Sequence, residues 1–161
     1  MLVGEHRRLE GLLAQATAHN GSLDLERYAE FRSGLLRHIA QEEKILLPAL
    51  ERLRGGKPVA VAKRLRLEHG AIAALLVPPP TRAIVATLRA VLAAHDPLEE
   101  GAGALYEAAD RIAAAESEEL VARLRSAPPV RASAYSEGAK VLPAVERALD
   151  RAGFRLVHGW R

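Results

Sequence analysis

Clusters of glycine and proline divide this chain into long segments of helical composition. They stand at residues 20–22 (NGS), 54–58 (RGGKP) and 78–80 (PPP), and residues of this kind end helices. We predict four long helices between them; these cover about residues 2–19, 23–53, 58–76 and 82–115, with Thr81 as the cap of the fourth. Short connections between long helices favour antiparallel neighbours. The expected fold is therefore all-α, an up-down-up-down four-helix bundle.

The last part of the chain has a different pattern. Residues 117–126 predict a further short helix, which completes a first unit of residues 1–126. After APP at 127–129, the stretch VRASAY alternates, the next stretch has the pattern of a helix that ends at glycine, and FRLVHGW has that of a short strand. We expect residues 127–161 to form a small C-terminal extension, a short β-α-β unit, in which no chemistry is recognisable.

Composition excludes several kinds of function. The chain has no cysteine, so a metal site must be built from histidine and carboxylate. Its start, MLVGEHRRLEGLLA, does not resemble a signal peptide, and no uncharged apolar run approaches membrane-spanning length. The net charge is +3, but the arginines are scattered beside glutamates along the helical segments. We expect a cytoplasmic protein that binds neither nucleic acid nor membrane.

Histidine and glutamate recur at a spacing that suits a metal ion. Three of the six histidines have a glutamate four residues later, on the same helix face; the pairs are His6–Glu10, His38–Glu42 and His95–Glu99. A single pair of this kind is usually a surface hydrogen bond. However, His6, His38, His69 and His95 fall one on each predicted long helix, on the apolar side. Four imidazoles without partners in one core would cost free energy, which a shared metal centre removes. The spacing therefore favours a metal site over four independent core histidines. His19 and His158 are given no metal role.

The sequence of residues 68–112 also repeats the pattern of residues 5–53. EHRRLEGLL at 5–13 matches EHGAIAALL at 68–76, and HIAQEEKILLPALERL at 38–53 matches HDPLEEGAGALYEAADRI at 95–112. Each half supplies two histidines and one glutamate of a His-x-x-x-Glu-Glu motif. That number of ligands suits a pair of metal ions bridged by carboxylates.

The order of these motifs resembles the hemerythrin-like, or HHE cation-binding, domain family over about residues 2–115. The resemblance implies a four-helix bundle with a non-haem di-iron centre. It implies that His6 and His38 bind one iron, that His69 and His95 bind the other, and that Glu42 bridges them. A second bridge would come from Glu99 or Glu100. Zinc or manganese could substitute for iron, since supply and geometry decide occupancy.

Two departures from the family pattern affect the site. Oxygen-carrying hemerythrins have a second histidine four residues after the third-helix histidine, and here Ala73 stands at that position. This leaves an open coordination position or a substitute ligand such as Glu68 or Glu10. Pro97, Gly101 and Gly103 interrupt the fourth helix, so both Glu99 and Glu100 remain candidates for the bridge, and the spacing favours Glu99.

Tyr106 lies on the face of His95 and Glu99 if the helix is regular, either as a hydrogen-bond donor to the site or as a core residue. The expected function is a di-iron protein that binds O₂ or a related small ligand such as peroxide or NO, in sensing, iron handling or oxidative-stress defence. The alternatives are a di-iron oxidase or peroxide-reducing enzyme on the same scaffold, and a metal-free helical interaction module. The oligomeric state is left open.

Overall fold

The computed structural model of the chain describes residues 1–18 and 22–157, and this part is all-helical, without a strand. The helices, in chain order, are α1 (Leu2–Ala16), α2 (Leu25–Gln41), η1 (Glu42–Leu46), α3 (Leu47–Leu53), α4 (Ala62–Leu75), α5 (Arg82–Glu100), α6 (Leu105–Ile112), η2 (Ala114–Glu116), α7 (Ser117–Arg125) and α8 (Val141–Ala152). The all-α prediction is confirmed.

The predicted short β-α-β unit at the C-terminus is wrong. Its central helix exists as α8, but residues 127–138 and 154–157 form neither strand nor helix. Side chains of other helices bind the backbone that strand pairing would have used. Arg32 donates to the carbonyl of Ser133 at 2.7 Å, and the Val157 N–H donates to the Thr87 hydroxyl at 2.8 Å. These bonds satisfy the backbone without a sheet.

Local sequence explains where several helices begin and end. Asp24 accepts hydrogen bonds from the backbone N–H groups of Glu26 and Arg27, which caps α2. Thr81 caps α5 through the N–H of Ile84 at 3.2 Å, as predicted. Gly153 ends α8 with a φ of 81°, a backbone conformation that favours glycine.

The second and fourth predicted helices are both interrupted beside a doubled glutamate. Between α2 and α3 lies η1, a short π-helix, and Pro48, which cannot donate the next helical hydrogen bond, follows it. The fourth predicted helix does not continue to residue 115, because α5 ends at Glu100. A Cβ at Gly101 would overlap the carbonyl oxygen of Pro97, so this helix end requires glycine.

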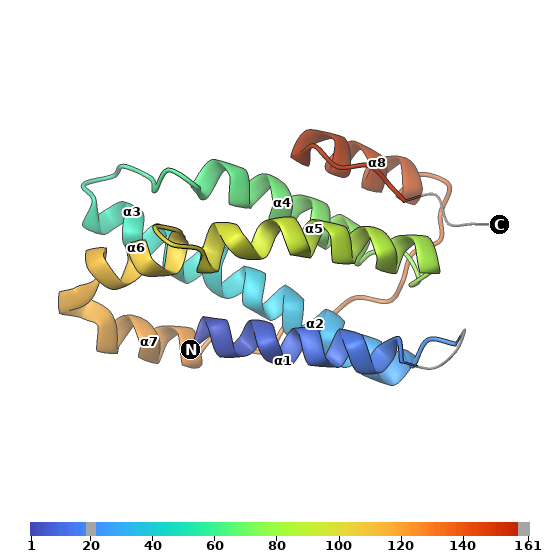
Figure 1. Cartoon of the computed structure of the whole chain (residues 1–161), viewed down its shortest axis with the longest axis horizontal. Helices are drawn as coiled ribbons and strands as arrows, with labels where there is room; N and C mark the ends of the chain where they lie inside the picture. The colour runs from blue at the N-terminus through green and yellow to red at the C-terminus, as the bar shows by residue number, and fades with distance from the viewer. Residues whose placement is uncertain (19–21, 158–161) are drawn as a thin grey trace.

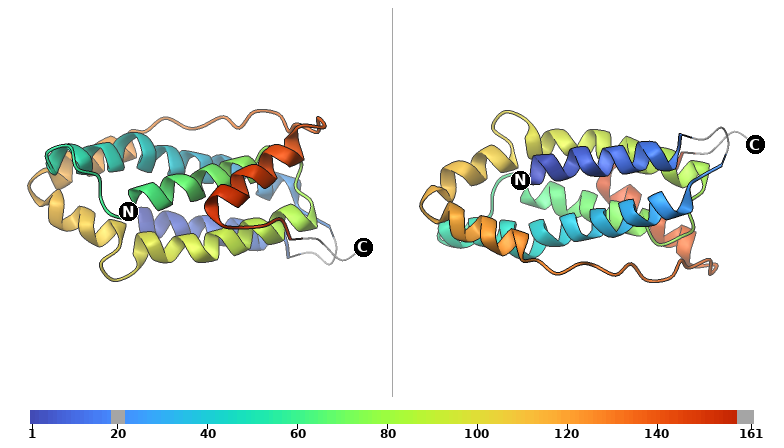
Figure 2. Two further views of the ribbon diagram at one scale, coloured as in Figure 1. Left: turned by 90° about the horizontal axis from the view of Figure 1, so that it is seen from above. Right: turned by 90° about the horizontal axis from the view of Figure 1, so that it is seen from below.

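The four long helices α1, α2, α4 and α5 lie side by side, and successive ones run in opposite directions (Figure 1). α1 packs against α2, and α4 packs against both α5 and α8. Figure 2 shows α3, α6 and α7 gathered at one end and α8 lying across the other. No helix in the described part is long and apolar enough to cross a membrane.

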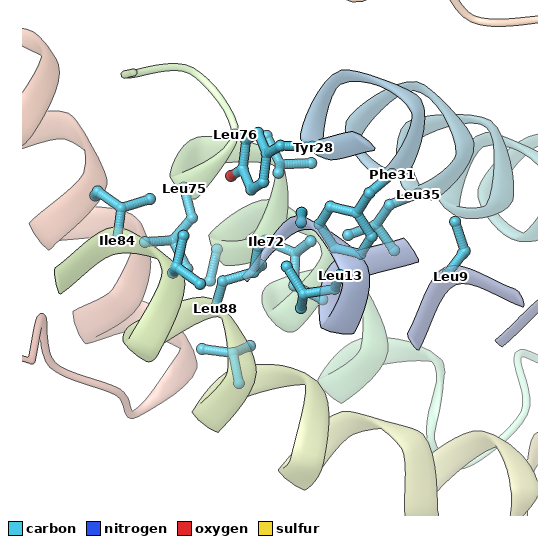
Figure 3. Packing of buried hydrophobic residues seen from close by; sticks show 14 of the residues in the cluster. Leu9, Leu13, Tyr28, Phe31, Leu35, Ile72, Leu75, Leu76, Ile84 and Leu88 are labelled. Atoms are coloured by element: carbon cyan, nitrogen blue, oxygen red, sulfur yellow. The ribbon is translucent and has the colours of Figure 1, made fainter. Parts of the chain in front are cut away.

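Buried apolar side chains form two separate clusters. The Ile72 cluster, shown in Figure 3, includes Leu9, Leu13, Phe31, Leu35, Ile72, Leu88 and Val91. The Leu50 cluster includes Leu2, Leu46, Leu47, Leu50, Leu65 and Leu105. Along α1, along α2 with η1, and along α4, a histidine stands between a residue of one cluster and a residue of the other. The polar side chains of the site are therefore enclosed between two apolar layers.

Candidate metal centre

Four histidines from four helices meet in the layer between the apolar clusters. His6 comes from α1, His38 from α2, His69 from α4 and His95 from α5. His38, His69 and His95 are buried, with 2%, 3% and 3% of their surface exposed, and His6 is partly buried. The Nε2 atoms of His6 and His38 are 2.7 Å apart. The structure brings His6 together with His38, and His69 together with His95, in the pairs that were predicted.

Two carboxylates, Glu42 and Glu99, lie among these imidazoles, and both are fully buried. Glu42 Oε1 is 3.4 Å from His38 Nε2, whereas Glu42 Oε2 is 3.2 Å from His69 Nε2. Glu99 Oε2 is 3.0 Å from His6 Nε2, whereas Glu99 Oε1 is 2.8 Å from His95 Nε2. Each carboxylate thus directs one oxygen toward each pair of histidines.

The ligand atoms form two neighbouring groups. In each group the atoms lie within 4.8 Å of one another. The first cluster is His6, His38, Glu42 and Glu99, and the second cluster is Glu42, His69, His95 and Glu99. Because Glu42 and Glu99 belong to both, the two groups share an edge made of two carboxylates. Two cations at adjacent positions would be bridged by both.

The other ring nitrogen of three of the histidines is held by an outer carboxylate. Glu100 contacts His6 Nδ1, Glu43 lies 2.6 Å from His69 Nδ1, and Glu68 lies 2.9 Å from His95 Nδ1. Such a bond keeps a proton on Nδ1 and fixes the ring, so that Nε2 is directed at the centre. His38 is the exception, since its Nδ1 is buried and makes no hydrogen bond within the described residues.

Local backbone structure explains how neighbouring glutamates serve different histidines. Glu42 and Glu43 begin the π-helix η1, in which the turn is wider than in an α-helix. Glu42 enters the centre, and Glu43 reaches His69 of α4. Glu99 and Glu100 occupy the last turn of α5, just before the required Gly101. Glu99 enters the centre, and Glu100 reaches His6 of α1.

The tyrosine of α6 completes the first cluster. The Tyr106 hydroxyl donates to Glu42 Oε1 at 2.5 Å and lies 3.1 Å from Glu99 Oε2. The same oxygen is 3.2 Å from His6 Nε2 and 3.3 Å from His38 Nε2. Burial, together with the charges of Glu42 and Glu99, raises the pKa of Tyr106 far above its ordinary value. Without a metal the phenol therefore keeps its proton.

The carboxylates determine the protonation of the imidazoles when no metal is bound. Burial lowers the pKa of His6, but hydrogen bonds to Glu99 and Glu100 outweigh it and raise that pKa to about 9. For His69 the same competition between burial and neighbouring glutamates raises the pKa to about 11. Burial raises the pKa of Glu99, yet hydrogen bonds from the four histidines hold that pKa well below its usual range. If these histidines held a cation, their Nε2 atoms would bind it in place of the protons.

A family of cation-binding domains matches the part of the chain that carries three of the four histidines of the site. The family model described as hemerythrin HHE cation-binding domain covers residues 1–77. Residues 1–77 match a hemerythrin HHE domain. The resemblance predicted from the motifs is confirmed over these residues. Comparison with curated proteins gave no match, and comparison with solved structures gave none either.

The HHE match covers His6, His38, Glu42 and His69, and the structure adds α5 with His95 and Glu99. The donor set suits a cation. Glu42 Oε2 is buried without a hydrogen bond in the described part, and acceptors converge on two points. Buried carboxylates need positive charge beside them, and a metal ion can supply that charge in place of the imidazole protons. The residues present therefore fit the cations that this family binds.

Three glutamates that the sequence offered as candidate ligands lie outside both clusters. Glu100 binds the outer nitrogen of His6, so Glu99 holds the shared position that spacing favoured. Glu68, a candidate substitute for the ligand missing at Ala73, instead binds His95 Nδ1 and Arg64. Glu10, the other candidate substitute, is exposed and belongs to neither cluster. His19 and His158 lie outside the described residues.

A cavity of about 340 Å³ leads to the site between α1, α2 and α5. Its walls are mainly apolar, and include Leu9, Leu13, Phe31, Leu35 and Leu92. His6, His38 and His95 also line it, so the cavity reaches both clusters. Glu10, Arg89 and Asp96 line it too, and a small ligand can approach the centre along this route.

Proposed function

We propose that this chain is a hemerythrin-like non-haem di-iron protein, an up-down-up-down four-helix bundle that binds O₂ or a related small ligand such as peroxide or NO. One observation carries the proposal. Glu42 and Glu99 each direct one oxygen toward His6 and His38 and the other toward His69 and His95. A site for a single metal would not need two carboxylates divided in this way.

The choice of iron rests on the ligands and on the family. Imidazole and carboxylate donors suit iron, zinc and manganese alike, whereas thiolate chemistry is absent because the chain has no cysteine. The HHE match over residues 1–77 favours iron through the di-iron centre that the resemblance implies. When bound there, iron would supply one-electron redox chemistry and coordination positions for a small ligand.

The residues of the chain orient the site and keep out water. Outer carboxylates hold the rings of His6, His69 and His95 in one orientation. In the metal-free site the hydroxyl of Tyr106 holds a proton beside Glu42 and Glu99. The apolar part of the cavity wall would admit a small ligand and limit the access of bulk water to the centre. Sensing, iron handling and oxidative-stress defence are all roles that such a site would serve.

Tyr106 also favours a second candidate, a di-iron oxidase or peroxide-reducing enzyme on the same scaffold. Reduction of peroxide needs a proton donor near the metals, and the phenol lies within hydrogen-bond distance of both shared carboxylates. A metal-free interaction module is disfavoured, because burying two carboxylates among four imidazoles costs free energy and a module of this kind would gain nothing from them.

Metal loading tests the proposal. Wild-type protein titrated with Fe(II) without oxygen and then exposed to air should hold two irons per chain by elemental analysis. It should also show the near-ultraviolet absorption of a bridged di-ferric centre. His38→Ala removes a ligand of the first cluster and His69→Ala one of the second, so each should lower the iron content. Glu10→Gln, which changes a cavity residue outside both clusters, should leave it unchanged.

The outcomes separate the candidates. The di-iron proposal is contradicted if the wild-type protein takes up no iron. It is also contradicted if both histidine variants take up as much iron as the wild type. Preferential uptake of zinc or manganese in competition would replace iron as the metal. Rapid consumption of peroxide that is lost in His38→Ala and kept in Glu10→Gln would favour the enzyme over the ligand-binding protein.

A further inference from the structure

The Tyr106 hydroxyl lies close to all four ligand atoms of the first cluster, which is more contacts than an ordinary hydrogen-bond donor makes. It comes from α6, a separate short helix after the end of α5, and its side chain is partly buried. Its oxygen is between 2.5 and 3.3 Å from four ligand atoms. Two of these are the oxygens that Glu42 and Glu99 direct toward the first cluster, and two are the Nε2 atoms of His6 and His38.

These distances match those between ligands of one metal ion. Bonds of roughly 2.0–2.2 Å from nitrogen and oxygen to the metal place neighbouring donor atoms roughly 2.8–3.5 Å apart. The Tyr106 oxygen has this separation, or slightly less, from every donor atom of the first cluster. Within the described part of the chain, no tyrosine hydroxyl contacts His69 or His95, the histidines of the second cluster.

Hydrogen bonding alone does not account for the arrangement. A phenol has one proton and two lone pairs, so it makes at most three good hydrogen bonds. Its proton is used by Glu42. When His6 and His38 act as metal ligands, their Nε2 atoms carry no proton. The phenol oxygen then faces two nitrogen lone pairs and a second carboxylate oxygen, and a cation at their centre makes these contacts favourable.

We propose that Tyr106 is a fifth protein ligand of the metal in the first cluster, bound through its phenolate oxygen. The inference rests on the proposed di-iron function. Ferric iron replaces the phenol proton, which is released to solvent. Tyrosinate is a known protein ligand of ferric iron, and a hard oxygen donor suits the oxidised metal. The first metal then has five protein ligands and the second has four, so open coordination is concentrated at the second.

Spectroscopy of the iron-loaded protein tests this assignment. A phenolate bound to Fe(III) gives a charge-transfer band in the visible range, and resonance Raman excitation in that band enhances the vibrations of the tyrosine ring. The wild-type protein, loaded with Fe(II) and oxidised in air, should show both signals. Tyr106→Phe should lose both and keep two irons per chain. Tyr28→Phe is the matched control, because Tyr28 is buried in the Ile72 cluster.

A second measurement keeps the test decisive if Tyr106→Phe does not fold. The chain has three tyrosines, so the double variant Tyr28→Phe, Tyr135→Phe retains Tyr106 alone. The phenolate signals should persist in this variant and shift when ring-deuterated tyrosine is incorporated. Two irons per chain without these signals would overturn the ligation by Tyr106 and leave the di-iron proposal intact. Failure to bind iron at all would overturn both.

Discussion

The two halves of the metal centre use the same motif and complete it differently. In each half the first glutamate of the doubled pair, Glu42 or Glu99, enters both clusters. The second glutamate, Glu43 or Glu100, crosses to a histidine of the opposite half. Neither half is therefore complete alone, because each orients a ligand of the other.

The difference lies in the glutamate that precedes the first histidine of each half. Glu68 precedes His69 and binds His95 Nδ1 at 2.9 Å. Glu5 precedes His6 in the same way, yet its carboxylate binds the guanidinium of Arg8 at 2.7 and 3.0 Å. His38, the counterpart of His95, is thereby left with an unsatisfied Nδ1. The second half has outer carboxylates on both histidines, whereas the first has one such carboxylate and Tyr106.

The largest expected effect separates the two adjacent glutamates of the second half. Glu99→Gln removes a carboxylate from both clusters, so we expect the protein to keep less than half of the wild-type iron. Glu100→Gln removes only the outer partner of His6 and should weaken iron binding by roughly 10- to 100-fold without abolishing it. Elemental analysis after dialysis and a competition titration with a chelator measure the two effects.

Both substitutions preserve side-chain size, so circular dichroism should show unchanged helix content in each variant. Equal iron content in the two variants would contradict the distinct roles of Glu99 and Glu100.

A smaller effect concerns pH and compares His6 of the first half with His69 of the second. In the metal-free protein both pKa values are raised above 6.5, to about 9 and about 11. The stability that these shifts contribute is complete below pH 6.5 and is lost as the pH rises through those values. For His6 the loss should be on the order of 2 kcal/mol, after allowance for screening by water at the partly exposed ring.

Urea unfolding of metal-free protein between pH 6 and pH 11 measures this loss. His6→Gln should remove the decline near pH 9, and His69→Gln should remove the later one. A free energy of unfolding that stays constant up to pH 10 would show that Glu99 and Glu100 do not hold a proton on His6.

Spacing along a single helix was enough to predict the inner residues of the site. A histidine and a glutamate four residues apart share a helix face, and one histidine on each of four helices places all four together. The outer partners depend on how far one helix is displaced along its neighbour, which no spacing reveals. Spacing therefore gave Glu43 no role, although it lies 2.6 Å from His69 Nδ1. The repeated Glu-Glu and Glu-His pairs were the available signal.

The C-terminal residues were harder to predict, because their partners come from distant parts of the chain. The alternation in VRASAY suggested a strand, but Arg32 and Arg37 of α2 bind the carbonyls of Ser133 and Ala127. The break after Glu100 was partly visible, since Pro97 and two glycines marked it. A regular helix would have placed Tyr106 on the face of His95 and Glu99. Because the helix breaks after Glu100, the Tyr106 hydroxyl lies near His6 and His38.

The smallest expected effect is that of Glu5, which we compare with its counterpart Glu68. Glu68→Gln removes the outer partner of His95 and should weaken metal binding by roughly 10- to 100-fold, because the imidazole is less basic and less well oriented. Glu5→Gln should change the affinity less than about threefold, since Glu5 binds the exposed Arg8 and no histidine within the described residues. Co(II) titration, followed by the visible absorption of the bound ion, measures both.

An equal loss in the two variants would mean that Glu5 turns from Arg8 to His38 when metal binds, which would make the two halves equivalent in the loaded protein. Arg8→Gln distinguishes this case, because release of Glu5 from the guanidinium should then tighten the binding of Co(II).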